Sequence, residues 1–529
     1  MKFEFKYKEQ AVLRKGILPI VFGIIIAFAG TRLVACAGPV WANQDEQRFL
    51  DAYRDYVDEN ATEDQLDRAD SLFIETVQVL RETYVFDVDT AKFVDDAIAS
   101  LPKLETKDHS PDNIVGEALD QSLHDLDPHS AYMSEDMFKR LQESTEGSFA
   151  GVGIVIAQDE DKQIRIVSPI DDTPAARAGL QPNDRITRID DHDMKGQPIA
   201  EAVRLMRGRV GEPVKLGILR KEKTFDVTIR RAKIEVPSVT ASIIDNDIPY
   251  VRVSRFDANT LEQTQDYLQE LKDKVRNPRG IIVDLRRNPG GLLDSAADLA
   301  DQFLTKGLIV ATEGRGERKM RTYEADRSSY FDGTPMVILL DRGSASGAEL
   351  MAAALRENGR GIIIGERSFG KGSMQRIMPL SGGGGVKITT GYYTTPEDHI
   401  VQGNGVVPDI EVQLKDAEEF DREIDLAHAL PPRRRDPRKT ITTVQADKCA
   451  ANIEIERLGN AGFHPEDQAP NPQTDEIEPQ DGDKTTDNAE ADKAETPHDE
   501  VLECAVGYFN NGMLAQYRAQ VEPLLRAGL

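Results

Sequence analysis

The chain has 529 residues, a formal net charge of −27 and 39% hydrophobic residues. A chain of this length exceeds a single hydrophobic core, so we expect two or more domains together with terminal segments. The apolar fraction is sufficient for packed globular domains. The negative charge argues against nucleic acid as a partner, because phosphate binding requires clustered Lys and Arg side chains.

The N-terminal segment, residues 1–42, has the features of an export signal. Basic residues precede an apolar run at 17–29, which is shorter than the roughly 20 residues that cross a bilayer. Signal cleavage after Ala42 is the leading interpretation. A lipoprotein signal ending at Cys36 and retention as an uncleaved membrane anchor are the alternatives. Each of the three predicts a periplasmic or other cell-envelope location, and the last two add membrane association through the N-terminus.

Residues 43–146 form a predicted helical N-terminal region. Apolar residues recur at roughly helical spacing between Leu72 and Val85, and a polar stretch at 106–112 interrupts the pattern. The sequence Leu-Asp-Pro-His-Ser at 126–130 predicts the end of a helix followed by a turn.

Residues 147–234 change to a pattern of short strands. A glycine-rich turn leads into an apolar strand, and paired strands are predicted at 214–219 and 224–229. Helices are predicted at 174–179 and 199–206. The pattern indicates a small β-rich barrel with two helices.

Residues 235–412 are predicted to form an α/β unit, because the strands are nearly continuous apolar runs of the kind that buried parallel strands require. Three strand-loop-helix units are predicted, with strands at 281–285, 337–340 and 361–365. In right-handed crossover units the carboxyl ends of the strands lie at one edge of the sheet. The three loops that follow these strands are therefore expected to converge in one crevice.

Chemically useful residues follow the three strands. In chain order they are Gly290, Gly291, Ser344, Ser346 and Lys371. Together they supply a hydroxyl at a helix start, an amine and flexible backbone amides, which are the parts that acyl transfer needs. The residues alone leave other interpretations open. The serines suit a helix N-cap, the glycines suit a turn, the lysine suits a solvated position, and the three loops together suit an anion site.

The C-terminal part is predicted in three pieces. Residues 413–463 form an extension, and 464–500 form an acidic linker whose composition indicates disorder. Residues 501–529 regain helical periodicity. Cys449 and Cys504 are candidates for a disulfide in an oxidising compartment, and two unrelated buried thiols are the alternative.

Several sequence blocks resemble one known family. They are Asn-Pro-Gly-Gly-Leu at 288–292, Gly-Ser-Ala-Ser-Gly-Ala-Glu at 343–349, Ser-Phe-Gly-Lys-Gly-Ser-Met-Gln at 368–375, and the blocks at 126–132, 147–154 and 405–410. In this order they are similar to the signature blocks of the carboxy-terminal processing (tail-specific) proteases, which are PDZ-containing Ser-Lys peptidases. The resemblance spans about residues 70–412. It implies an α/β protease core (crotonase/Clp-like) with a PDZ domain placed upstream and helical N- and C-terminal regions.

The resemblance assigns the catalytic residues by position. Ser346 is the implied nucleophile, Lys371 the base and Gln375 the residue that orients the base. The implied oxyanion hole uses backbone amides of the Gly-Gly loop and of the residue after the serine, here Gly290 or Gly291 together with Gly347. No metal and no cofactor is implied.

Two positions depart from the family pattern. Gly347 stands where Ala is frequent, which keeps the amide, and residues 396–402 replace a segment of the Gly-Arg-Ser-Ile-Gln type, which alters the expected rim of the cleft. The predicted mechanism also sets a physical requirement. A lysine with its ordinary pKa near 10.4 is protonated at neutral pH, so Lys371 needs a desolvated cleft that lowers its pKa.

The PDZ resemblance covers 147–234. It implies a carboxylate-binding loop, an added peptide strand and an apolar pocket for the last residue of a protein tail. The implied peptide-binding residues are Gly151, Val152, Gly153, Ile154 and Met206. Arg207 matches an arginine that relays PDZ position to the protease core in some members. A barrel without a ligand and an ordinary surface arginine are the respective alternatives.

The expected function is a cell-envelope serine endopeptidase that selects proteins by apolar C-terminal tails. The expected partners are these substrates, an adaptor protein and further copies of the chain, since terminal helical regions in the family often mediate dimerisation. A catalytically inactive PDZ scaffold and a coenzyme A-dependent enzyme are the competing functions. A Ser–His–Asp mechanism is the competing chemistry. It would use His399, which we interpret as a residue of the cleft rim, whereas His129 is interpreted as a turn residue.

Overall fold

The computed structural model describes residues 42–104, 109–159, 162–170, 172–326, 329–415, 421–435, 439–440, 442–449, 453, 455–458 and 499–510. The predicted export signal with Cys36, most of the predicted acidic linker and residues 511–529 lie outside these ranges. Within the described ranges, no helix combines the length and the apolar composition that a membrane crossing needs.

The N-terminal region is helical, as predicted. Its helices are α1 (Gln44–Tyr53), α2 (Glu63–Thr83), α3 (Thr90–Ser100), α4 (Pro111–His124) and α5 (Glu135–Thr145), with short 3-10 turns η1 (Arg54–Tyr56) and η2 (Leu101–Lys103). Thr62 caps α2 in a capping box with Gln65, which explains why the helix begins there. Helices α1 to α4 share one apolar core that includes Phe49 and Phe73. That core extends to Ile388 on strand β18, so the helices pack directly against a sheet.

This sheet is antiparallel and carries part of the candidate site. Its strands are β1 (Ala131–Met133), β13 (Leu308–Gly314), β14 (Arg318–Glu324), β17 (Ser373–Pro379) and β18 (Gly385–Thr394), with η3 (Arg315–Glu317) between β13 and β14. Strand β18 pairs with β1, β13 and β17. The central strand of this sheet therefore connects the helical region to the chain around Lys371.

The β-rich region forms its own core. Its strands are β2 (Ser148–Gly151), β3 (Ile154–Gln158), β4 (Ile164–Pro169), β5 (Arg185–Ile189), β6 (His192–Asp193), β7 (Pro213–Arg220), β8 (Lys223–Arg230) and β9 (Ala232–Glu235), with helices α6 (Pro174–Arg177) and α7 (Ile199–Met206). The main sheet has the order β3-β4-β5-β7-β8, and β2 pairs with β9 where the chain enters and leaves. The predicted pair of strands and both predicted helices are confirmed.

The largest sheet contains the predicted parallel strands. Its order is β20 (Thr442–Gln445), β19 (Ile410–Gln413), β16 (Ile362–Gly365), β15 (Met336–Leu340), β12 (Ile281–Asp284), β11 (Ile248–Val253), β10 (Val239–Ile244) and β21 (Ile455–Arg457). Pairing from β11 through to β20 is parallel, and β10 and β21 add antiparallel strands at one edge. The prediction of buried parallel strands is confirmed.

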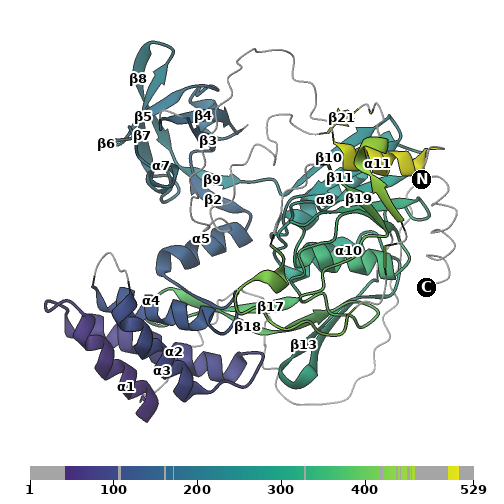
Figure 1. Cartoon of the computed structure of the whole chain (residues 1–529). Helices are drawn as coiled ribbons and strands as arrows, with labels where there is room; N and C mark the ends of the chain where they lie inside the picture. The colour runs from purple at the N-terminus through teal and green to yellow at the C-terminus, as the bar shows by residue number, and fades with distance from the viewer. Residues whose placement is uncertain are drawn as a thin grey trace, which may run out of the picture. The chain divides into compact units, whose positions relative to one another are not determined.

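Helices cover both faces of this sheet, which explains its continuous apolar strands. One face packs against α8 (Thr260–Lys274), α9 (Leu293–Asp301) and α10 (Gly347–Glu357) in a core that contains Ile338 and Ile363. The other face, with Val337 and Ile364, packs against α11 (Glu500–Phe509), which is yellow in Figure 1. The short turns η4 (Glu423–Asp425) and η5 (Ala446–Lys448) complete the elements.

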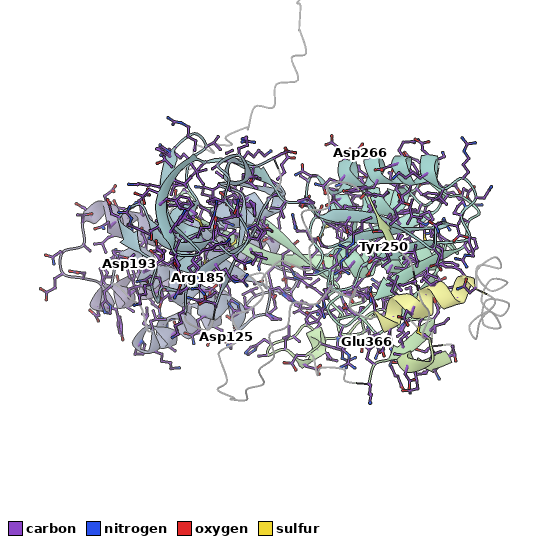
Figure 2. All side chains as sticks on the ribbon, turned by 90° about the horizontal axis from the view of Figure 1, so that it is seen from above. Asp125, Arg185, Asp193, Tyr250, Asp266 and Glu366 are labelled. Carbon is purple, nitrogen blue, oxygen red and sulfur yellow. A yellow bond between two sulfur atoms is a disulfide. The ribbon has the colours of Figure 1, made fainter. Side chains whose placement is uncertain are left out.

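One disulfide and one ion pair hold α11 on the sheet. Cys449 and Cys504 form a disulfide, which confirms that candidate pair. Arg286 donates to both carboxylate oxygens of Asp499 at 2.7 Å, directly before the helix begins. Arg286 also bonds the buried Asp284 at the end of β12, and Tyr250, labelled in Figure 2, donates to the same carboxylate.

One predicted element is wrong. The third strand-loop-helix unit does not exist, because β16 is followed by a loop and then by strand β17. Gly370 has a φ of 104°, outside helical geometry, and a Cβ on Gly372 would lie 2.4 Å from the backbone nitrogen of Gln402. This close approach of two backbone segments holds the loop extended, and the residues that follow pair with β18. The crotonase/Clp-like description of the core stays a prediction.

Candidate active site

Two serines lie in the loop between β15 and α10, and their surroundings differ. The Ser344 side chain is fully buried, donates to the carbonyl oxygen of Leu285 at 2.9 Å and accepts the amide of Asp341 at 3.0 Å. Ser346 is half-buried and stands at the N-cap of α10. The spacing of the motif could not separate these serines, whereas burial does, because Ser344 is committed to holding the loop.

Ser346 has a strained backbone that glycine neighbours accommodate. Its φ of 53° and ψ of −114° lie in a region that residues with a side chain rarely adopt. A Cβ on Gly290 would lie 2.7 Å from the Cβ of Ser346, and a Cβ on Gly291 would lie 2.0 Å from the carbonyl oxygen of Phe256. The Gly-Gly loop therefore lies directly against the serine, and only glycines allow this approach.

The backbone amides around Ser346 differ in whether they already donate a hydrogen bond. The amide of Gly290 donates to the Oδ1 atom of Asn288 at 2.8 Å. Within the described part of the chain, the amides of Gly291 and Gly347 donate to no acceptor. The prediction left Gly290 and Gly291 as alternatives, and this geometry favours Gly291 as the partner of Gly347.

Lys371 lies in the loop between β16 and β17, and its surroundings disfavour a charged amine. Burial and the charge of Lys387 together lower its pKa to about 8, against the opposing effects of Glu423, Asp127 and Glu349. The pKa of Lys387, on β18, is itself lowered by burial. The requirement that the predicted base be desolvated is therefore met by its position.

One buried carboxylate joins the serine loop to the lysine loop. The Oε2 atom of Glu349 accepts the backbone amides of Ser346 and Lys371, both at 2.8 Å. Its Oε1 atom accepts the Ser368 hydroxyl at 2.6 Å and the amide of Gly370 at 2.7 Å. Burial raises the pKa of Glu349 to about 8, although these donors favour the ionised form.

The sequence motifs assigned no role to Glu349. The signal was present, because a Glu three residues after a Ser at a helix start is the capping-box pattern. The side chain bonds the Ser346 amide in that way. Its additional bonds to the Lys371 loop depend on tertiary structure and have no local sequence signal.

The predicted orienting residue has other partners. The Nε2 atom of Gln375 donates to the Ser373 hydroxyl at 2.9 Å and to the Thr389 hydroxyl at 3.2 Å. In the described residues no hydrogen bond joins Gln375 to Lys371, so its role stays a prediction. The hydroxyl of Tyr393 donates to the carbonyl oxygen of Lys371 and holds that backbone instead.

The turn at 126–130 contributes a further layer of polar groups. Asp127 is buried and accepts the hydroxyl of Thr389 at 2.9 Å. The Nε2 atom of His129 lies 2.8 Å from the Oε2 atom of Glu423. Burial lowers the pKa of His129, and the charge of Lys371 lowers it further. His129 thus lies in a turn, as predicted, and also faces the surroundings of the lysine.

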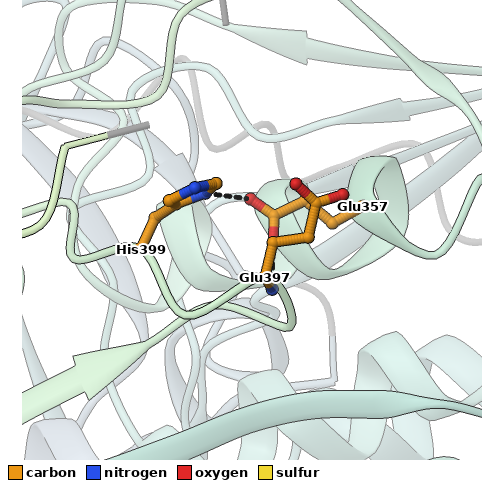
Figure 3. A group of neighbouring side chains, drawn as sticks. All are labelled: Glu357, Glu397 and His399. Carbon is orange, nitrogen blue, oxygen red and sulfur yellow. Dashed lines mark hydrogen bonds and ion pairs between the residues drawn. The ribbon is translucent and has the colours of Figure 1, made fainter. Parts of the chain in front are cut away.

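His399 lies at the far end of α10 from Ser346. Its Nδ1 atom is 3.5 Å from the Oε1 atom of Glu357, the last residue of that helix (Figure 3). A helix of 11 residues is about 16 Å long, so His399 does not reach the serine. Glu357, Glu397 and His399 also form the grouping of metal-type ligands found among the described residues, with ligand atoms within 4.8 Å of one another. The guanidinium of Arg356 lies 4.0 Å from Glu357.

The predicted peptide-binding residues of the β-rich region lie together. Strand β3 is an edge strand of its sheet and begins at Ile154, beside helix α7. Gly153 has a φ of 81°, and a Cβ there would lie 2.3 Å from the Cβ of Thr173. Val152 and Met206 are buried in the same core, and Ile154 packs against it. An open strand edge beside an apolar helix face is the geometry for peptide addition.

Arg207 follows α7 and contacts residues that precede the main sheet. Its guanidinium bonds Glu143 of α5 at 3.1 Å and lies 5.0 Å from the ring centre of Phe149 on β2. These contacts link the end of α7 to the chain that enters the β-rich region. The structure does not bring Arg207 to the Lys371 loop, so a relay to the core stays a prediction.

Two regions of the chain match models of known protein families. Residues 247–412 match the model of peptidase family S41, and residues 165–220 match a PDZ domain model. The first range contains Ser346 and Lys371, and the second covers the middle of the β-rich region, from β4 to β7.

Curated relatives cover more of the chain. A carboxy-terminal-processing protease of Bartonella bacilliformis is 41% identical over 304 residues, which are 57% of this chain and 70% of the relative. Carboxy-terminal processing protease CtpB of Bacillus subtilis is 30% identical over 416 residues, or 77% of this chain and 78% of the relative. CtpA of the same organism is 34% identical over 309 residues, which are 58% of this chain and 65% of the relative.

One solved structure is also similar to part of the chain. The photosystem II D1 C-terminal processing protease is 25% identical and covers 70% of this chain and 93% of its own, with a TM-score of 0.40. The assignment itself rests on the sequence relatives. The chain therefore belongs to the carboxy-terminal processing proteases of peptidase family S41, which are serine-type peptidases, and it carries a PDZ domain.

Proposed function

We propose that the protein is an endopeptidase of the cell envelope that cleaves through Ser346 and Lys371 and selects substrates by their C-terminal tails. The observation that carries the proposal is the Glu349 carboxylate, which holds the backbone of both residues at 2.8 Å. A half-buried serine and a lysine with a pKa lowered to about 8 are thereby fixed in one site. An inactive PDZ scaffold would have no need for this arrangement.

In the proposed reaction, the neutral amine of Lys371 accepts the proton of the Ser346 hydroxyl as its oxygen attacks the scissile carbonyl. The carbonyl oxygen becomes an oxyanion, which the amides of Gly291 and Gly347 stabilise. The positive end of the α10 dipole at the same place favours the developing charge. Collapse of the intermediate breaks the C–N bond, and Lys371 returns the proton to the leaving amine.

Deacylation repeats these roles with water. The acyl group is then an ester on Ser346, and a water molecule attacks its carbonyl while Lys371 accepts a water proton. Breaking the ester bond gives a new carboxyl terminus, and the proton returns to the Ser346 oxygen. The enzyme is regenerated without a metal or a cofactor, as in other acyl-enzyme hydrolases.

The proposed tail-binding site is the edge of β3 beside α7. Amides of the turn at 151–154 would hold the terminal carboxylate, and the apolar surface near Met206 would take the last side chain. An adaptor protein and a second copy of the chain are further partners in this proposal. The location outside the cytoplasm is supported by the export features of residues 1–42 and by the Cys449–Cys504 disulfide, since structural disulfides are typical of oxidising compartments.

The catalytic assignment is tested with an unfolded protein substrate that ends in apolar residues. We expect Ser346→Ala and Lys371→Ala to abolish measurable cleavage, whereas Ser344→Ala, checked for folding by thermal denaturation, still turns over. Cleavage that survives loss of Ser346 or Lys371 would refute the assigned pair.

Tail selection is tested separately on the wild-type enzyme. The same substrate is prepared with a free or an amidated C-terminus, which removes the carboxylate without changing the scissile region. We expect KM to rise for the amidated form. Equal KM and kcat for both forms would remove the PDZ domain from substrate selection and leave the catalytic assignment intact.

A further inference from the structure

A groove lined by arginines lies beside the lysine loop. It has a volume of about 530 Å³, and its lining also includes Gly403, Asn404, Ile424 and Pro432. The arginines are Arg367, Arg422, Arg433, Arg434 and Arg435. The whole chain has a net charge of −27, so this concentration of positive side chains in one groove runs against the general composition.

Carboxylates of the protein neutralise only some of these charges. Arg433 pairs with Glu317 at 2.9 Å, and Arg434 pairs with Asp398 at 3.1 Å. Arg422 lies 3.8 Å from Asp425, which is half exposed. Three of the five arginines therefore have carboxylate partners within the protein.

Arg367 and Arg435 lack such partners. In the part of the chain that the structure describes, neither residue forms an ion pair. The Nε atom of Arg367 is buried and has no hydrogen-bond acceptor. Burial lowers the pKa of Arg367, and the charges of Arg422 and Arg435 lower it further. Buried donors are nearly always satisfied in folded proteins, so this geometry indicates a site completed by an external anion.

The groove is joined directly to the loop that carries the proposed base. The amide of Gly403 donates to the carbonyl oxygen of Gly370 at 2.8 Å, and the amide of Glu423 donates to that of Phe369 at 3.1 Å. Arg367 belongs to the same loop, four residues before the lysine. The same loop also contacts the serine loop, because the amide of Phe369 donates to the carbonyl oxygen of Ser344 at 3.0 Å.

We propose that the arginine groove binds an acidic segment of the polypeptide substrate beside the scissile bond. The proposal rests on the proposed function, since it takes the substrate to be a polypeptide held at Ser346. Guanidinium groups match carboxylates by paired hydrogen bonds, and away from its terminal carboxylate a polypeptide offers those of Asp and Glu side chains. The overall negative charge disfavours nucleic acid or an anionic membrane surface, which would repel the rest of the molecule.

Direct binding separates this proposal from catalysis. The full-length Ser346→Ala protein is titrated into fluorescein-labelled hexaglutamate or hexaglutamine, and fluorescence anisotropy is measured at low and high salt. We expect the hexaglutamate peptide to bind at least about tenfold more tightly, and added salt to remove most of the difference. Equal affinity for the two peptides would overturn the proposal, whether or not the enzyme cleaves by Ser346.

A charge-matched pair of variants locates the site. Arg367→Gln with Arg435→Gln removes two positive charges from the groove, and we expect it to weaken hexaglutamate binding about tenfold or more. Arg318→Gln with Lys319→Gln removes two charges from exposed positions on β14, outside the groove, and should leave affinity nearly unchanged. Equal losses in both variants would show a general charge effect and contradict a specific groove.

The chain's own acidic stretch is tested as the competing occupant. Removal of residues 464–498 from the Ser346→Ala protein should leave hexaglutamate affinity unchanged if the groove serves substrates. A rise of about tenfold or more would show that this stretch competes for the groove, and would overturn the assignment to substrate.

Kinetics then test the effect on cleavage. Two substrates differ only in Glu or Gln residues beside the scissile bond, and kcat and KM are measured for the wild type and the Arg367→Gln/Arg435→Gln variant. We expect about tenfold lower KM for the acidic substrate with the wild type, and equal KM values with the variant. A preference that persists in the variant, or is absent in the wild type, would contradict the proposal.

Discussion

Two buried clusters of charged residues lie near strand ends of the large sheet, and they differ in how completely their charges are paired. Asp284 is fully buried, accepts from Tyr250 at 2.7 Å and bonds both Arg252 and Arg286, while Arg286 also pairs with Asp499. Burial alone would raise the pKa of Asp284, but the charges of Arg286 and Arg252 hold it below its usual range. This cluster stays ionised at any physiological pH.

In the cluster around Lys371, burial outweighs the charge pairing and disfavours the charged amine. Burial and the like charge of Lys387 lower the pKa of the amine to about 8, while Glu349 has a pKa raised to about 8. These groups therefore change protonation near neutral pH. The comparison teaches that burial alone does not mark a functional charge. A paired buried charge supports the fold, whereas one left short of partners is available for proton transfer.

The largest effect should come from breaking the paired cluster. Asp284→Ala leaves two arginines without their buried partner, so we expect a loss of about 3–5 kcal/mol in the free energy of unfolding. Urea denaturation followed by circular dichroism measures it. The matched control is Asp294→Ala, because Asp294 is exposed and pairs with Arg321 at 2.8 Å, and it should cost at most about 1 kcal/mol. Similar losses in both variants would show that the buried charge pair matters no more for stability than the exposed one.

Glu349→Gln tests the link between the two catalytic loops. Each oxygen of Glu349 accepts from backbone or hydroxyl donors, so either orientation of the amide turns an NH₂ group toward donors and displaces a loop. We expect kcat to fall about 100-fold, because small misplacements of catalytic groups have effects of this size. KM should change little. A loss expressed mainly in KM would indicate that Glu349 serves substrate binding rather than positioning.

Lys371→Met tests the unfavourable burial of the amine. The pKa of Lys371 is lower in the folded state than in the unfolded state, so the unfolded state binds more protons between about pH 8 and 10.4. Wild-type stability should therefore rise across that window relative to the variant. Below pH 8 the variant should be the more stable, by roughly 3 kcal/mol. Paired denaturation curves at pH 7 and pH 10 measure this, and an unchanged difference would contradict a desolvated lysine.

Local patterns predicted much of this molecule. The fully buried strand β15 has a continuous apolar sequence because helices cover both of its faces, and that signal does not depend on distant residues. Helix α7 has the bounds expected from its periodicity. The disulfide candidates were found because Cys449 and Cys504 are the cysteines that follow the predicted signal.

Long-range contacts explain what the sequence could not provide. Spacing alone did not separate Ser344 from Ser346; the resemblance implied Ser346, and the burial of Ser344 against Leu285 became visible only in the fold. The partners of Gln375, Ser373 and Thr389, depend on the pairing of β17 with β18, so its sequence position did not indicate them. Three arginines of the groove are consecutive at 433–435, but only the fold brings Arg367 beside them.

The most direct test of the account is the pH dependence of kcat/KM from pH 6 to 10. If a neutral Lys371 is the base, kcat/KM rises about tenfold per pH unit below an inflection near pH 8 and is level above it. The residual activity of Glu349→Gln keeps an inflection, because the titrating amine is still present. A wild-type profile that is flat, or one that rises only near pH 10.4, would contradict the claim that burial makes this lysine the base.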